Sequence, residues 1–291
     1  MATFIENNQG SNTGWLYYKN YYGDALNDDV LITRINNQIF RKGIFGIPNE
    51  VKNHTITAVT VYPGLIMGTG YTHENKDSEE AFKIGFFFDH SSGMPVITGS
   101  SVKGILRSAF PQRVVIPKKT TANQVEKESW ISEILRELCD IEDEINIDEL
   151  EREIFDGAYK TPDPDSIGQN KIKHVPVYER DIFFDAVPVA ITGDNIGTSR
   201  QLFGSDYITP HKNKDNRVEL DPFSNPTPLK FLKILPKVKF EFRFKLENSI
   251  VFPSITAKAK LILFSEILRT LGIGAKTNVG YGQLDISEEP V

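Results

Sequence analysis

Residues 271–284 read Leu-Gly-Ile-Gly-Ala-Lys-Thr-Asn-Val-Gly-Tyr-Gly-Gln-Leu and separate an amphipathic helix pattern from a final strand pattern. Glycine lets the backbone adopt positive φ and lets other groups approach closely, because it has no Cβ. Consecutive N–H groups in such a loop can converge on one anion. Lys276 adds positive charge, Asn278 adds donors, and Tyr281 offers a ring on which a base could stack. The stretch therefore predicts a loop that binds a phosphate backbone.

A purely structural role for these glycines is the alternative. Gly272 could end the preceding helix in the left-handed conformation, and Gly280 and Gly282 could mark a bulge in the strand that follows. A Walker loop is excluded, because Ala275 separates Gly274 from the lysine and a helix, not a strand, comes first. The same order of elements excludes a dinucleotide-binding fingerprint.

The rest of the chain alternates strand patterns with two helix patterns. β-branched residues alternate over residues 55–62, which predicts a strand. Further strands are expected at 82–88, 182–191, 227–235, 237–246 and 283–286, with a short extended piece at 94–97. Pro188 places its strand at an edge of the sheet or ends it. The helix patterns cover residues 98–110 and 254–271. The order strand, helix, strands, helix, strand predicts an α+β, ferredoxin-like (RRM-like) fold with an antiparallel sheet.

The first helix pattern carries its own anion-binding features. Ser100 or Ser101 can cap the helix. Lys103 and Arg107 are four residues apart and therefore share one face. That face begins one turn from a helix N-terminus, whose free N–H groups favour an anion.

In the second helix pattern, Leu261, Phe264, Leu268 and Leu271 line one face, and Lys258 and Lys260 are expected to lie off it.

Charge is unevenly distributed along the chain. The 291 residues have a formal net charge of −6. From position 126 to 156 there are 13 acidic and 3 basic residues, a net of −10, so the remainder carries −6 − (−10) = +4. No acidic residue occurs from 90 to 125, a stretch that holds the bases Lys103, Arg107, Arg113, Lys118 and Lys119. The acidic total therefore does not argue against a nucleic-acid partner.

Two segments stand apart from the core pattern. Residues 1–53 are rich in asparagine, tyrosine and glycine, and we expect an N-terminal extension that packs on the core or on a partner. Residues 54–291 are expected to form a single domain, with an acidic helical insertion at about 120–165 whose apolar stripe is Trp130, Ile134, Leu138 and Ile141.

The composition indicates a cytoplasmic protein. Cys139 is the only cysteine, which excludes an internal disulfide and a thiolate metal cluster. No secretory signal is recognisable, and no apolar run approaches the ~18 residues of a membrane span. We expect no cofactor, no metal and no membrane contact.

Two segments together resemble the RAMP superfamily, the repeat-associated subunits of CRISPR effector complexes. Residues 97–110, Ile-Thr-Gly-Ser-Ser-Val-Lys-Gly-Ile-Leu-Arg-Ser-Ala-Phe, resemble the first-helix motif, and residues 272–282 resemble the C-terminal glycine-rich loop. Further motifs at 87–95, 184–188 and 206–211 resemble those of the family of sixth subunits of the Cmr complex, the type III-B effector. The resemblance covers roughly residues 55–286.

The resemblance implies a non-catalytic subunit that holds the 3′ part of a guide (CRISPR) RNA, stacks on related Cmr RAMP subunits and contributes to antiviral defence. Target RNA is a further candidate partner. The predicted RNA-binding residues are Ser100, Ser101, Lys103, Arg107, Gly272, Gly274, Lys276, Thr277, Asn278, Gly280, Tyr281 and Gly282. Backbone contacts of this kind position RNA without reading its sequence.

Two other classes of function stay open. A RAMP-family endoribonuclease that cleaves CRISPR precursor or target RNA would need a base, for which the candidates are Asp77, in a polar loop-like stretch, and the five histidines His54, His73, His90, His174 and His211. Neither paired histidines at metal-ligand spacing nor a nucleophile elbow occurs. A protein scaffold that barely touches RNA would use the aromatic N-terminus and the acidic insertion.

We predict that Asp77→Ala and His211→Ala leave target-RNA cleavage by the assembled effector complex unchanged, because a solvated turn and a structural loop account for these residues. The measurement is the cleavage rate of labelled target RNA by complexes of verified composition. Loss of cleavage with normal assembly in either variant would favour the endoribonuclease.

Overall fold

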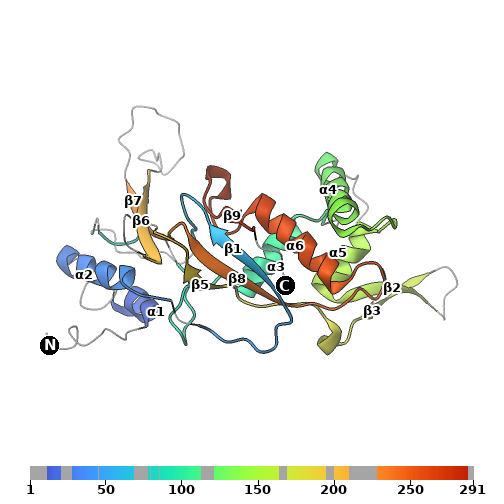
Figure 1. The fold of residues 1–291 in the computed structure, drawn as a ribbon, viewed down its shortest axis with the longest axis horizontal. Helices are drawn as coiled ribbons and strands as arrows, with labels where there is room; N and C mark the ends of the chain where they lie inside the picture. Colours follow the sequence, from blue (N-terminus) through green and yellow to red (C-terminus); the bar gives the residue numbers. More distant parts are fainter. Residues whose placement is uncertain are drawn as a thin grey trace.

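The computed structural model places most of the chain. It describes residues 12–20, 28–44, 46–68, 78, 80–84, 86–112, 121–163, 169–194, 200–209 and 228–287. A central sheet with its covering helices lies between two groups of peripheral elements, one around α1, α2, β6 and β7 and the other around α4, α5, β2 and β3 (Figure 1). The central part positions the candidate site.

The central sheet is five-stranded and antiparallel. It contains β1 (His54–Thr60), β4 (Ile182–Phe183), β5 (Val187–Ile191), β8 (Val238–Lys245) and β9 (Leu284–Asp285). The strand order is β4-β8-β1-β9, and β5 also pairs with β8. In the β1–β8 register, Ile56 faces Phe242 and Ala58 faces Phe240, and all four side chains are buried. This order is that of the split β-α-β fold, so the predicted ferredoxin-like class is confirmed.

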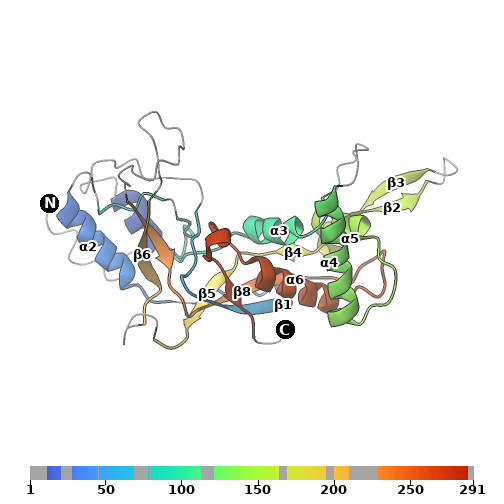
Figure 2. The same cartoon turned by 90° about the horizontal axis from the view of Figure 1, so that it is seen from above.

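Two helices cover one face of this sheet. Both α3 (Gly99–Ser108) and α6 (Ala257–Leu271) lie on the same side of β1 and β8 (Figure 2). The Thr256 side chain caps α6 by accepting a hydrogen bond from the Ala259 amide. Of the apolar face predicted for α6, Leu261, Phe264 and Leu268 are buried. The Phe264 ring lies 5.6 Å from that of Phe244 on β8, which joins helix to sheet.

The first peripheral group buries an aromatic cluster. It comprises α1 (Thr13–Trp15), the π-helical turn η2 (Leu16–Asn20), α2 (Asp29–Phe40), β6 (Phe203–Ile208) and β7 (Leu229–Ile234). The Tyr17 hydroxyl donates to the Ile84 carbonyl at 2.8 Å, and its ring stacks on Phe82. Phe86 and Phe203 extend the cluster to β6. The aromatic residues of the N-terminal segment therefore pack against residues 82–88; Tyr21 and Tyr22 lie outside the described residues.

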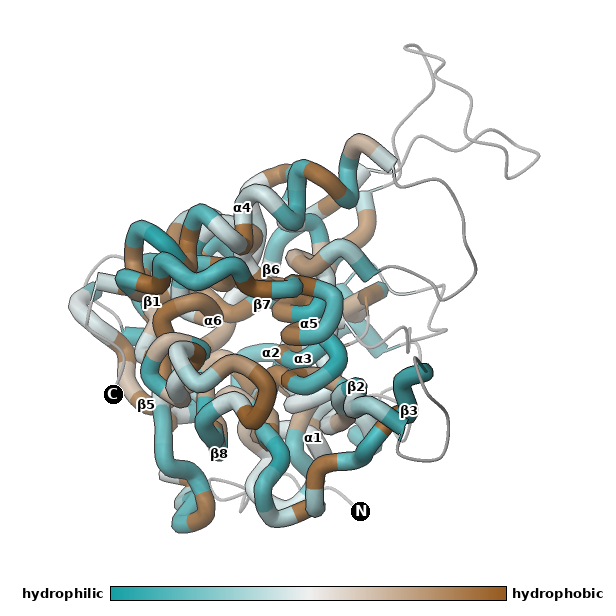
Figure 3. The backbone as a smooth tube through the Cα atoms, turned by 90° about the vertical axis from the view of Figure 1, so that its right-hand side faces the viewer, coloured by the Kyte–Doolittle hydropathy of each residue, from teal (hydrophilic) through white to brown (hydrophobic). Residues whose placement is uncertain are grey.

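The second peripheral group contains the acidic segment. It comprises α4 (Ala122–Cys139), α5 (Ile147–Asp156), β2 (Ala158–Pro162), β3 (Asn170–His174) and the short 3-10 turn η3 (Val177–Glu179). Hydrophobic and hydrophilic positions alternate along α4 and α5, as expected for helices with one buried side (Figure 3). Of the predicted stripe, Ile134 and Ile141 are buried, but Leu138 is 50% exposed and was wrongly included. Ile131 and Leu135 complete the buried side of α4.

Two strand predictions need correction. The described residues of the range 82–88 do not form a strand, because their amides bond singly to different segments, Lys83 to the Lys230 carbonyl and Phe87 to the Met67 carbonyl. The strand expected over 182–191 is divided into β4 and β5. Between them, Ala186 leaves β8 and exchanges both backbone hydrogen bonds with Ile97, just before α3. Pro188 lies in β5 at the edge of the sheet, as predicted.

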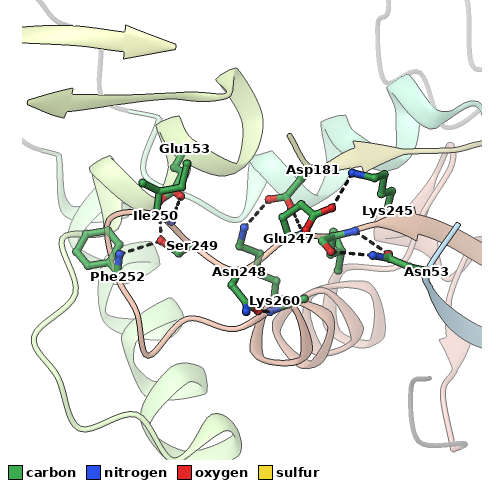
Figure 4. A network of polar contacts seen from close by, with 12 residues as sticks. Asn53, Glu153, Asp181, Lys245, Glu247, Asn248, Ser249, Ile250, Phe252 and Lys260 are labelled. Atoms are coloured by element: carbon green, nitrogen blue, oxygen red, sulfur yellow. Dashed lines mark hydrogen bonds and ion pairs between the residues drawn. The ribbon is translucent and has the colours of Figure 1, made fainter. Parts of the chain in front are cut away.

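A buried polar network fixes the loop between β8 and α6 (Figure 4). The Lys260 ammonium lies 2.7 Å from an Asp181 carboxylate oxygen, and both side chains are almost inaccessible. Burial raises the pKa of Asp181, although Lys260 acts in the opposite direction. Ser249 donates to Glu153 at 2.6 Å, which ties the same loop to α5. The expectation that Lys260 lies off the buried face of α6 was wrong. The side chain is buried because Asp181, 79 residues away in the sequence, neutralises its charge there.

We predict that Phe264→Ala lowers the free energy of unfolding by ~3–5 kcal/mol, because the ring is fully buried between the sheet and the helices. The matched control Leu138→Ala removes a half-exposed side chain from α4 and should cost under ~0.5 kcal/mol. Urea denaturation of both variants provides the measurement. Equal losses of unfolding free energy in the two variants would contradict the assignment of Phe264 to the core.

Candidate nucleic-acid interface

The glycine-rich loop connects α6 to β9 and turns back on itself. Gly272, Gly274, Gly280 and Gly282 all have positive φ, at 66°, 95°, 95° and 71°. Lys276 also lies in the left-handed region, at φ 60°. The loop follows the end of α6 in Figure 1. Repeated left-handed residues reverse the chain within a few positions, which glycine permits without strain.

Three of the glycines are required by close backbone contacts. A Cβ on Gly282 would lie 1.8 Å from the Ile273 carbonyl oxygen, one on Gly272 would lie 2.6 Å from the Gly282 oxygen, and one on Gly274 would lie 2.5 Å from the Ile66 oxygen. These approaches form a backbone seam between the loop and residues 64–66. It contains three hydrogen bonds, from Ile273 to Gly282, from Ala275 to Ile66 and from Gly282 to Gly64. The seam amides therefore bond to the protein itself and hold the loop in shape.

The tip of the loop faces solvent. We define the tip as residues 276–280, which contain the 3-10 turn η4 (Thr277–Val279). Lys276 and Asn278 are exposed, Thr277 is half-buried, and the Val279 side chain is 62% exposed. Within the ranges that the structure describes, the Lys276 ammonium has no carboxylate partner. The tip therefore offers a positive charge, an amide and a hydroxyl on a fixed backbone.

Tyr281 directly follows the tip and is engaged within the protein. Its hydroxyl donates to an Asp206 carboxylate oxygen at 2.8 Å. Its ring meets the Phe231 ring edge-on at 5.9 Å, and the Lys233 ammonium lies 5.7 Å from its centroid. Burial and the neighbouring Asp206 raise the pKa of the tyrosine. These contacts make Tyr281 an anchor between the loop and the β6–β7 hairpin.

Asp206 binds both Tyr281 and Lys233 and so stabilises the contact between the loop and the β6–β7 hairpin. It forms an ion pair with Lys233 at 2.6 Å in addition to accepting from Tyr281. Burial alone would raise the pKa of Asp206, but the bonds from Lys233, Tyr281 and the Tyr207 amide outweigh it and hold the pKa below its usual value. A depressed pKa means that the carboxylate stabilises the fold above about pH 4 and that this contribution is lost as the pH falls further. Asp206 therefore has a structural role.

The N-terminus of α3 is capped from within the chain. The cap residue is Thr98, whose side chain accepts from the Ser101 amide, so the prediction of Ser100 or Ser101 as the cap was wrong. An Asp185 carboxylate oxygen accepts from the Gly99 amide at 2.7 Å. A carboxylate at this position already compensates the positive end of the helix. Ser100 and Ser101 are exposed and share their hydroxyls with Thr98.

The two predicted cations of α3 have different surroundings. Lys103 is half-buried, with its ammonium 5.8 Å from the Phe183 ring centroid. Arg107 makes two parallel hydrogen bonds to Asp156, at 2.7 and 3.0 Å, and a third to Glu151. The hydrogen bonds that Arg107 donates to Asp156 raise the pKa of the guanidinium above its usual value. Because Arg107 is paired in this way, it joins α3 to α5 and is not part of the candidate RNA interface.

The structure does not place the two predicted segments against each other. The start of α3 is anchored by Phe183, Asp185 and Ala186, at the β4–β5 edge of the sheet. The glycine loop is anchored by residues 64–66 and leads into β9, at the opposite edge. The loop tip is therefore the candidate site that the geometry favours, and α3 stays a separate candidate.

Several candidate residues lie outside the described part of the chain, namely His73, Asp77, Arg113, Lys118, Lys119 and His211. Among the residues that are described, no group of three or more His, Cys, Asp or Glu side chains could hold a metal ion. In that same part of the chain, no helix is both long and apolar enough to cross a membrane.

Comparison with known families identifies the class of protein. The RAMP superfamily model matches residues 57–285, and the chain belongs to this superfamily. It is also similar to the CRISPR system CMR subunit Cmr6 of Saccharolobus solfataricus (strain ATCC 35092 / DSM 1617 / JCM 11322 / P2), with 34% identity over 87 residues. That alignment covers 30% of this chain and only 28% of the relative's length. The predicted resemblance to the sixth Cmr subunit is confirmed.

A solved structure of a Cmr complex shows the same fold. A chain in the cryo-EM structure of the type III-B Cmr-beta complex bound to cognate target RNA matches with a TM-score of 0.50 and 21% identity, over 90% of this chain and 74% of that one. The crystal structure of Cmr6 from Pyrococcus furiosus matches with a TM-score of 0.39 and 22% identity, over 79% and 96% of the two chains. The first match supports the ferredoxin-like architecture described above.

We predict that Gly282→Ala destabilises the protein more than Gly280→Ala. Both residues have positive φ, so each alanine costs ~1–2 kcal/mol in backbone strain. Only at position 282 would the new Cβ meet a backbone oxygen, and overpacking of this kind adds ~1–3 kcal/mol. Free energies of unfolding from urea titration measure the difference. If Gly280→Ala lowers the free energy of unfolding by the same amount, the close approach of the Ile273 oxygen does not explain why position 282 requires glycine.

Proposed function

We propose that this chain is a non-catalytic RNA-binding subunit of a type III-B CRISPR (Cmr) effector complex, which holds the 3′ part of the guide RNA through its phosphate backbone. Membership of the RAMP superfamily and the similarity to Cmr6 support the class of complex. The observation that carries the RNA-binding role is the exposed loop tip, where Lys276 has no carboxylate partner among the described residues.

The chemistry of the tip suits the phosphate backbone. A lysine ammonium, an asparagine amide and a threonine hydroxyl each donate to phosphate oxygens. Contacts to the backbone carry no sequence information, which a guide of variable sequence requires. The seam below the tip fixes its backbone before RNA arrives, so little conformational entropy is lost on binding.

The proposed role is positioning, without a chemical step. Residues 272–282 contain no carboxylate and no imidazole, the groups that serve most often as general acid or base. The acidic helices α4 and α5 leave the chain with a net charge of −6, so we expect weak RNA binding by the isolated chain and tighter binding among neighbouring subunits. The 3′ location and the neighbouring Cmr subunits follow from the resemblance.

We predict that Lys276→Ala lowers guide-RNA affinity about tenfold at low salt, since a hydrogen bond to a charged group contributes ~1.5 kcal/mol or more. The effect should be the same for unrelated guide sequences. The slope of log affinity against log salt should become shallower by ~0.7, the value for one phosphate of a single strand. Lys276→Ala with Asn278→Ala should weaken binding further.

The matched control is Lys258→Ala, which removes the same charge from an exposed position in the first turn of α6, at the end of the helix away from the loop. It should leave both affinity and slope near wild type. Filter binding across a salt series, with complexes of verified composition, provides the measurement. If Lys276→Ala and Lys258→Ala behave alike, the tip is not the RNA site.

A further inference from the structure

An exposed tyrosine stands beside the loop tip. Tyr62 follows β1 and is 84% exposed, the largest exposed fraction among the large hydrophobic and aromatic side chains of the described residues. A ring of this size normally buries much of its surface, because burial of aromatic area is favourable. Its exposure on a bonded turn marks a side chain that is available to a ligand.

The turn that carries Tyr62 is held against the glycine loop. The Gly64 amide donates to the Val61 carbonyl at 2.8 Å, which closes the turn around the tyrosine. The Val61 amide donates to the Gln283 carbonyl, just after the loop. Pro63 lies against Gly280, where its Cδ is 3.6 Å from the position that a Cβ would occupy. The turn that carries Tyr62 is therefore held next to the tip.

Tyr62 and Tyr281 divide the roles that one aromatic residue was expected to fill. Tyr281 is bonded to Asp206, and its ring contacts Phe231 and Lys233. Tyr62 is near enough to contribute to the raised pKa of Tyr281, yet its own ring is open. The base-stacking role predicted for Tyr281 therefore fits Tyr62 better.

We propose that Tyr62 is a stacking platform for an unpaired RNA base whose flanking phosphate lies on Lys276 and Asn278. This inference rests on the proposed RNA-binding role of the tip. Aromatic rings beside a cationic groove are how proteins bind single strands without sequence preference, since every base has a π face. Tyr62 thus adds affinity while leaving the choice of guide sequence free.

The chemistry around Tyr62 favours RNA over a protein partner. A protein contact site places its aromatic anchor within an apolar patch. The tip against which Pro63 lies carries an exposed lysine and an exposed asparagine, and its exposed apolar side chain is Val279. A cation and an amide next to a free ring are the combination that a sugar-phosphate chain with an unstacked base would contact.

The test uses the full chain at low salt with a short oligouridylate and measures its affinity across a salt series. Tyr62→Ala should weaken binding about fivefold to 150-fold, the range that ~1–3 kcal/mol of stacking corresponds to. Tyr62→Phe should bind like wild type, because it keeps the ring. The salt slope of Tyr62→Ala should equal that of wild type, since no charge is lost, whereas Lys276→Ala should have a shallower slope. Tyr178→Ala, at a 73% exposed tyrosine of η3, is the matched control.

A second readout locates the contact. Irradiation of the chain with an oligonucleotide that carries 5-iodouridine should give a base adduct on Tyr62, identified by mass spectrometry. Wild-type affinity of Tyr62→Ala, or adducts that omit Tyr62 while Lys276→Ala still weakens binding, would overturn the stacking role and leave the proposed function intact. Loss of subunit association in Tyr62→Ala without any effect on RNA affinity would indicate a protein contact and overturn it too. Absence of binding by the wild-type chain at low salt, together with no effect of Lys276→Ala on guide-RNA affinity in complexes of verified composition, would count against the proposed function itself.

Discussion

The backbone seam between residues 64–66 and the glycine loop is the constraint on which the candidate interface depends. Carbonyl oxygens of Ile66, Ile273 and Gly282 occupy the space that side chains would need at the opposing glycines. This packing joins the end of β1 to the end of α6, so the loop inherits its position from the sheet and the helix that define the fold. The result is a tip whose backbone is fixed and whose side chains are free.

Contacts within the chain explain why some of the predicted RNA-binding residues are structural. Tyr281, Asp206 and Lys233 anchor the loop to the β6–β7 hairpin, and Arg107 joins α3 to α5 through Glu151 and Asp156. Each of these polar groups has a partner of opposite charge or a hydrogen-bond acceptor within the chain. Groups that are satisfied internally stabilise the platform, and groups that remain open, such as Lys276 and Tyr62, are available for recognition.

The order of the core elements could be predicted from sequence because it depends on local patterns. The alternation in β1 and the helical spacing of Leu261, Phe264 and Leu268 are visible within a few residues, and the two RAMP-like segments agree with them. The even spacing of Phe82, Phe86 and Phe88 suggests a strand from the sequence alone. In the structure these rings pack on Tyr17 and Phe203, which come from distant segments. The Thr98 cap was missed because three neighbouring hydroxyl residues offer equally good local patterns.

The parts of the site that could not be predicted depend on long-range partners. Nothing near Lys260 in the sequence indicates Asp181, and nothing near Arg107 indicates Asp156. Which tyrosine is free is likewise decided by the β6–β7 hairpin, which engages Tyr281 and leaves Tyr62 exposed. The central claim, that the loop tip and the adjoining turn bind RNA, is tested most directly by amide hydrogen exchange of the full chain with and without bound RNA. The account predicts added protection at the amides of residues 276–280, Tyr62 and Gly64 and little change at the start of α3. Protection confined to α3, with the loop unchanged, would contradict it.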